Sequence, residues 1–76
     1  MSQRIPSLKP AHIIRTLLKL GLTIHHQTGL HVRLKHPETG RSLTIARHDR
    51  FELWHVVTQK ILRQANIAED QFLEKL

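Results

Sequence analysis

The chain contains no cysteine and no tyrosine, and its 76 residues include only one tryptophan and two phenylalanines. Without cysteine there is no disulfide framework and no thiolate metal site. With so few aromatic rings, a surface that binds single strands by stacking their bases is not expected. No apolar run approaches the roughly 18 residues of a membrane span, and the N-terminus lacks the apolar stretch of a secretory signal. These absences predict a soluble, cytoplasmic protein.

Acidic residues are also scarce, since 6 Asp and Glu stand against 12 Lys and Arg and give a formal net charge of +6. The excess of positive charge lies in residues 1–63, whereas residues 64–76 are slightly acidic. A basic body favours a polyanionic partner, most simply nucleic acid, although surface charge can also serve solubility alone. A chain of this length forms one small domain, which buries roughly 60% of the surface that its unfolded form exposes.

The hydrophobic pattern predicts an α+β domain in the order α-β-β-β-α, followed by a short C-terminal helix. We expect residues 1–9 to form an N-terminal tail and residues 10–76 a single domain. The expected elements are a helix over 10–20, strands over 22–27, 30–35 and 42–47, a helix ending at Asn66, and a helix over 68–76. Because the strand connections are short, the strands should form an antiparallel meander with the helices on one face. The other face of the sheet should contact solvent.

The strand expected over 30–35 alternates between apolar and polar residues, which is the period of a half-buried strand. Its core-facing side should be formed by Leu30, Val32 and Leu34. Its solvent-facing side should present a row of three basic side chains, His31, Arg33 and Lys35. Guanidinium and ammonium groups bind phosphate, and an imidazole can transfer a proton near neutral pH. The row therefore indicates a surface that binds a polyanion and could cleave it.

Further candidates lie in and after the loop that follows the third expected strand. His48 could act as a second proton carrier, or it could be an ordinary solvated histidine. Arg47 and Arg50 flank it and would extend the charge available to phosphate. Trp54 lies near the start of the next helix, where we expect core packing first and contact with a partner second.

The seven histidines do not form a pattern typical of a metal site. Metal ligands on a helix are three or four residues apart, and no such pair has a credible third ligand. His25 and His26 are adjacent, so they should project to opposite faces of a strand, and the pattern does not decide which of them faces outward. We therefore expect neither a metal nor a small-molecule cofactor.

The ordered set of these features resembles the HicA family, which are small toxins of toxin–antitoxin modules. The resemblance covers about residues 9–76. It depends on Gly29-Leu30-His31, together with flanking segments at 17–22, 35–37, 48–50, 61–67 and 72–73. It implies a fold like that of double-stranded-RNA-binding domains and metal-free cleavage of mRNA, with His31 at the position of the family's catalytic histidine. It also implies a HicB-type antitoxin that covers this site.

Two positions depart from the family's pattern. The residue between the glycine and the histidine is usually small, whereas this chain has Leu30. The second long helix usually opens with a Gly-Thr pair, which offers a phosphate-binding N-terminus, whereas this chain has Val56-Val57. Two functions stay open. One is an endoribonuclease that uses His31, assisted by His48, and the other is an impaired member that binds nucleic acid or docks an antitoxin. The candidate RNA-binding residues are Gly29, Arg33, Lys35, Arg47 and Arg50.

Overall fold

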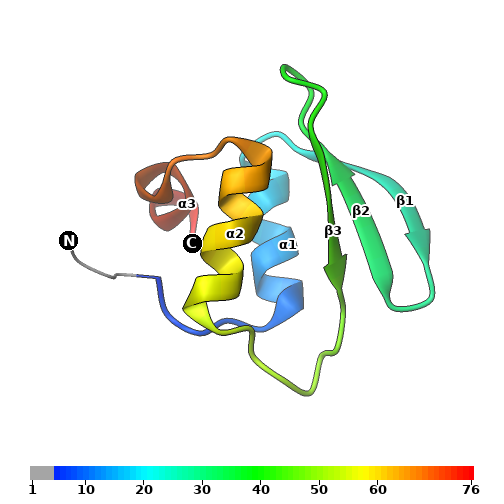
Figure 1. Ribbon diagram of the computed structural model, residues 1–76, viewed down its shortest axis with the longest axis vertical. Coiled ribbons are helices and arrows are strands. Elements are labelled where there is room, and N and C mark those ends of the chain that lie inside the picture. Colours follow the sequence, from blue (N-terminus) through cyan, green and yellow to red (C-terminus); the bar gives the residue numbers. More distant parts are fainter. Residues whose placement is uncertain (1–4) are drawn as a thin grey trace.

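The computed structural model describes residues 5–76 and shows a small sheet packed against helices (Figure 1). The elements are α1 (Pro10–Lys19), β1 (Thr23–Thr28), β2 (His31–Lys35), β3 (Ser42–Ala46), α2 (His55–Ala65) and α3 (Glu69–Lys75). The strands form one antiparallel sheet in the order β1-β2-β3. This arrangement confirms the expected α+β class and meander, and each strand boundary lies within one residue of its expected position.

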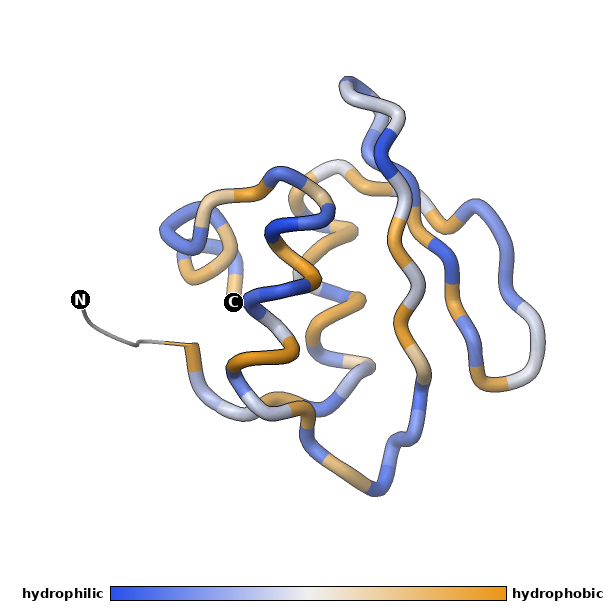
Figure 2. Tube along the Cα trace, viewed as in Figure 1, coloured by the Kyte–Doolittle hydropathy of each residue, from blue (hydrophilic) through white to orange (hydrophobic). Residues whose placement is uncertain are grey.

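The core lies between one face of the sheet and the helices. On β2 and β3 every second residue is buried, and the inward side chains are Val32, Leu34, Leu43 and Ile45. Figure 2 shows the corresponding alternation of hydrophobic and hydrophilic residues along these strands. From the helices, α1 contributes Ile13 and Leu17, and α3 contributes Phe72. The opposite face of the sheet is therefore left to solvent, as the sequence pattern predicts.

The helix ends follow local sequence signals. Pro10 begins α1, where its fixed φ suits the first turn and its missing N–H costs no hydrogen bond. Asn66 ends α2 in the left-handed conformation, with φ of 59°, as expected for its position. Ala68 precedes α3 and has no side-chain acceptor to cap it. Instead, the side-chain oxygen of Gln71 accepts a hydrogen bond from the Ala68 backbone N–H at 3.2 Å.

The segment before α1, which we expected to be a tail, contributes to the core where the structure describes it. Ile5 and Leu8 are both buried. Leu8 and Leu53 form an antiparallel bridge with N···O distances of 3.2 Å and 2.6 Å. Burial of two aliphatic side chains and two backbone hydrogen bonds fixes this segment against the start of α2. Residues 1–4, the remainder of the expected tail, lie outside the described residues.

Two residues that we expected to face the core are instead exposed. Leu30 is 51% exposed because it lies in the turn before β2, so the inward face of that strand does not include it. Trp54 is 63% exposed because it precedes the first turn of α2, whose buried stripe begins further along with Thr58 and Ile61. Within residues 5–76, no helix has both the length and the apolar character needed to cross a membrane.

Candidate active site and nucleic-acid interface

His31 is the first residue of β2 and follows a tight turn from β1. Thr28 pairs with His31, so Gly29 and Leu30 alone connect the two strands. Gly29 has a φ of 55°, whereas Leu30 has no positive φ, which is the combination of a type II′ turn with glycine at its first central position. No neighbouring atom lies within 4 Å of where a Cβ on Gly29 would stand. The glycine is therefore required for its backbone conformation, which fixes where β2 and His31 begin.

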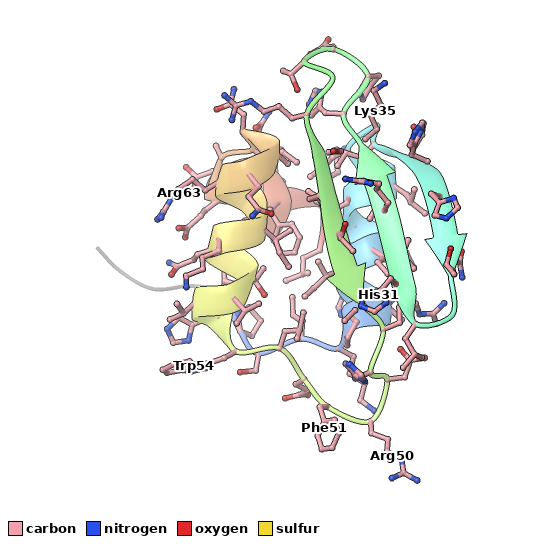
Figure 3. All side chains as sticks on the ribbon, turned by 45° about the vertical axis from the view of Figure 1, so that its right-hand side comes forward. His31, Lys35, Arg50, Phe51, Trp54 and Arg63 are labelled. Atoms are coloured by element: carbon pink, nitrogen blue, oxygen red, sulfur yellow. The ribbon has the colours of Figure 1, made fainter. Side chains whose placement is uncertain are left out.

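The side chains of His31, Arg33 and Lys35 all face solvent, as the alternation predicts. Figure 3 shows His31 and Lys35 at opposite ends of β2. Alternate side chains on a strand are about 7 Å apart along it, so the three groups form a row roughly 14 Å long. We call these three residues the cationic row. They can contact neighbouring groups of an extended polyanion.

The strands on both sides of the cationic row leave its charge uncompensated. Cross-strand partners share a face, and the partners on β3 are small, namely Ala46, Thr44 and Ser42. No aspartate or glutamate occurs in β1, β2 or β3. The open face of the sheet is therefore accessible and positive, which suits phosphate.

On β1 the structure shows a hydrogen-bonded pair, His26 and Thr28, that the sequence did not predict. His26 lies opposite Arg33, and its Nε2 is 2.6 Å from the hydroxyl oxygen of Thr28, the residue paired with His31. The register shifts between Ile24 and His26, so the strand does not keep a strict alternation. This irregularity is the reason that sequence could not decide between His25 and His26, because a bulge shifts which residues face outward.

The loop between β3 and α2 begins beside the turn that carries His31. The Arg47 backbone N–H donates to the Leu30 carbonyl at 2.6 Å. The Arg47 guanidinium is half-buried and lies 3.2 Å from the Asp49 carboxylate, so part of its charge is already compensated. Arg50 is exposed at the far end of the loop and extends into solvent (Figure 3). Of the two arginines in this loop that were expected to bind phosphate, Arg50 is the more exposed.

His48 follows two residues after Ala46, the cross-strand partner of His31. Its side chain is exposed and lines a shallow groove of about 290 Å³ between β3 and α2, together with Val57, Lys60 and other residues. His31 does not line this groove. The structure therefore brings the backbones of the two histidines close but does not bring their imidazoles into one cavity, and a catalytic role for His48 stays a prediction.

The imidazole of His31 is free to react with a ligand. None of the described residues forms a hydrogen bond with it. Among residues 5–76 there is also no group of three or more His, Asp or Glu side chains that could hold a metal ion. The chemistry available here is proton transfer by an exposed imidazole beside cations that stabilise negative charge.

The two departures from the family pattern both place apolar groups on the surface. Leu30, which directly precedes His31, is half-exposed. Val57 in the first turn of α2 is 40% exposed, and that helix begins without a side-chain cap or an acidic residue.

The structure is that of a small basic α+β protein. One face of its antiparallel sheet is open and carries the cationic row, and helices cover the other face. The position of His31 at the start of β2 is fixed by a glycine turn. Residues 11–67 match the family model described as the HicA toxin of bacterial toxin–antitoxin systems. Because the match covers well over half of the chain, the chain belongs to the HicA toxin family. A comparison with curated proteins found no match. Membership makes the chain a toxin of a toxin–antitoxin module, which in general has a partner antitoxin.

Proposed function

We propose that this toxin is a metal-independent endoribonuclease that cleaves mRNA, with His31 as general acid or base. The observation that supports it most is the position of His31, which is exposed at the end of a row of cations on a sheet without carboxylates. Membership of the HicA family supports the same activity. We expect the substrate to be met in the cytoplasm.

RNA carries its own nucleophile, so the protein has to move protons and stabilise charge. The 2′-hydroxyl oxygen attacks the adjacent phosphorus, its proton passes to a base, and the bond from phosphorus to the 5′-oxygen breaks as that oxygen takes a proton. The products are a 2′,3′-cyclic phosphate and a 5′-hydroxyl. An imidazole can serve as either the base or the acid. Arg33 would stabilise the charge that develops on the phosphate, and Lys35 and Arg50 would hold flanking phosphates.

The activity is tested by incubating the purified protein with RNA in the presence of EDTA and identifying the product ends. We expect cleavage that survives the chelator and leaves 2′,3′-cyclic phosphates. An RNA with 2′-deoxy sugars at the cleavage sites should stay intact, because it lacks the attacking hydroxyl. Cleavage that requires a divalent ion, or that cuts the deoxy substrate equally well, would contradict the proposal.

The cationic row should also determine how binding responds to salt. We expect Arg33→Ala, measured in a His31→Ala background that prevents cleavage, to weaken RNA binding and to reduce the salt slope by about 0.7 on single strands. The matched control is Arg63→Ala, because Arg63 is an exposed arginine that points away from the sheet on α2 (Figure 3). Binding titrations at several salt concentrations give both slopes. Equal effects of the two substitutions on RNA binding would show that the cationic row is not part of the binding site.

Leu30 favours a second candidate function, in which the chain binds RNA or its antitoxin without efficient cleavage. Its half-exposed side chain lies directly before His31, where the family usually has a small residue. We expect Leu30→Ser to raise the single-turnover rate of RNA cleavage, because a smaller side chain lets the phosphate approach. Stability should change by less than about 0.5 kcal/mol, as for other exposed positions. An unchanged rate would show that Leu30 does not limit the reaction.

We further propose that the partner of this toxin is a HicB-type antitoxin that covers the cationic row. A protein that neutralises the toxin has to block access of RNA to His31, and an acidic surface would complement Arg33 and Lys35. Competition between the antitoxin and RNA for the His31→Ala protein tests this proposal. Simultaneous binding of both would contradict it.

A further inference from the structure

Two of the three aromatic residues of the chain, Phe51 and Trp54, are exposed, and both lie in the segment that joins β3 to α2. Phe51 is 67% exposed and Trp54 is 63% exposed, the highest values among the large apolar side chains of the described residues. Phe72, the remaining aromatic residue, is fully buried. Phe51 is at the tip of the loop between β3 and α2 and Trp54 is at the start of α2, and both rings point away from the body of the protein (Figure 3). Aromatic rings are a main source of core stability, so their exposure here suggests a ligand.

The backbone that carries Phe51 is fixed by hydrogen bonds. The Phe51 N–H donates to the His48 carbonyl at 3.0 Å, which closes a turn. Two residues later, Leu53 exchanges two backbone hydrogen bonds with Leu8, and the Leu53 side chain packs partly against the core. The loop is thus anchored on both sides of its exposed tip.

Trp54 is held in a similar way. It is the N-cap residue of α2, and its carbonyl accepts a hydrogen bond from the Val57 N–H at 2.9 Å. Its ring lies edge-on to the ring of His55, with the two centroids 5.3 Å apart. A contact that favours one orientation of a side chain lowers the conformational entropy lost when that side chain binds a ligand.

We call residues 47–54, which join β3 to α2, the aromatic loop, and this loop begins at the residue after the cross-strand partner of His31. Ala46 pairs with His31, and the next residue, Arg47, is hydrogen-bonded to the turn. Phe51 follows five residues after Ala46, so its backbone lies within about 17 Å of the end of β3. A strand of nucleic acid that leaves the cationic row at His31 can therefore reach this loop.

The charges of the loop favour an anionic strand. Asp49 is paired with Arg47 at 3.2 Å. Glu52 lines a separate hollow near the start of α1, together with basic residues. Arg50 forms no ion pair with another described residue and projects next to the aromatic tip (Figure 3). Cations for phosphates and exposed rings for bases are the combination that binds single-stranded nucleic acid.

We propose that Phe51 and Trp54 stack on unpaired bases of a single-stranded RNA whose phosphates follow the cationic row. This inference rests on the proposed function, which makes RNA the ligand, and it identifies the residues that contact the bases of that RNA. Unpaired bases are required, because stacking faces are not accessible inside a duplex. The small number of aromatic residues suggested that no such surface exists, but their number did not show that two of them are exposed between β3 and α2.

The experiment uses Trp54 as its own reporter, because it is the only tryptophan of the chain. The His31→Ala protein is titrated with a short oligoadenylate, with a blunt RNA duplex and with inorganic polyphosphate while tryptophan emission is recorded. We expect the oligoadenylate to quench the emission and polyphosphate to leave it unchanged. Binding of labelled oligoadenylate should weaken about 5-fold to 150-fold in Trp54→Ala and less in Trp54→Phe, since a phenyl ring can still stack.

The matched control is Leu18→Ala, which shortens an exposed apolar side chain of α1 and should leave binding unchanged. Equal affinity of Trp54→Ala and the parent protein would overturn the inference, as would equal quenching by polyphosphate or by the duplex. If Trp54→Ala impairs only binding of the antitoxin, the rings belong to a protein interface and the inference is wrong. The titrations use a protein that does not cleave RNA, so a negative result in them contradicts this inference alone. A wild-type protein that does not digest RNA contradicts the proposed function alone.

Discussion

Replacement of His31 by alanine is expected to slow RNA cleavage about 10²-fold to 10⁴-fold, the range for loss of a general acid or base. The imidazole is exposed at the start of β2 and has no hydrogen-bonding partner among the described residues, so it is available to exchange a proton with bound RNA. The rate is measured under single-turnover conditions with saturating RNA, so that a change in binding does not contribute. His12→Ala is the matched control, since His12 lies on α1, away from the open face of the sheet.

The same substitution should leave the fold intact. An exposed residue at the end of a strand usually changes the free energy of unfolding by less than about 0.5 kcal/mol. Urea unfolding of the wild-type and His31→Ala proteins measures this difference. If the variant cleaves slowly but has wild-type stability, the loss lies in the chemical step. If it cleaves at the wild-type rate, His31 is not the catalytic residue.

Replacement of Phe72 by alanine is expected to lower the free energy of unfolding by about 3–5 kcal/mol. Phe72 is the largest fully buried side chain of the described residues, and it anchors α3 to the core. A domain of this size has a total stability on the order of 5–10 kcal/mol, so the loss is a large part of the whole. The midpoint of urea unfolding, compared with that of the wild-type protein, gives the change.

Glu74→Ala serves as the control for Phe72→Ala, because it changes an exposed residue of the same helix. It should shift stability by less than about 0.5 kcal/mol. Phe72 also lies beyond residues 11–67, the range of the family match, so its effect tests whether α3 belongs to the cooperative unit. A loss below about 1 kcal/mol would show that α3 detaches without unfolding the rest.

The periodicity of the sequence predicted the fold well because, within a regular helix or strand, it shows which residues face the core. The alternation of β2 gave the inward Val32 and Leu34 and the outward His31, and a single local signal gave the left-handed end of α2 at Asn66. Where an element ends, periodicity no longer defines a face. Leu30 and Trp54 each precede the first residue of an element, and both are exposed although their apolar character suggested the core.

Contacts between distant segments could not be predicted from local pattern. The bridge that buries Leu8 beside Leu53 joins the chain before α1 to the chain before α2. The bulge in β1, which sets His26 opposite Arg33, depends on pairing with β2 rather than on any residue of β1 alone. The cationic row was therefore predictable, whereas the His26–Thr28 pair and the exposed aromatic loop required the structure.

The catalytic role of His31 is tested most directly by analysing the ends of one RNA after incubation with the wild-type protein and with His31→Ala, side by side and in EDTA. We expect 2′,3′-cyclic phosphate ends with the wild-type protein and intact RNA with His31→Ala over the same period. Equal amounts of cyclic phosphate from both proteins would contradict it.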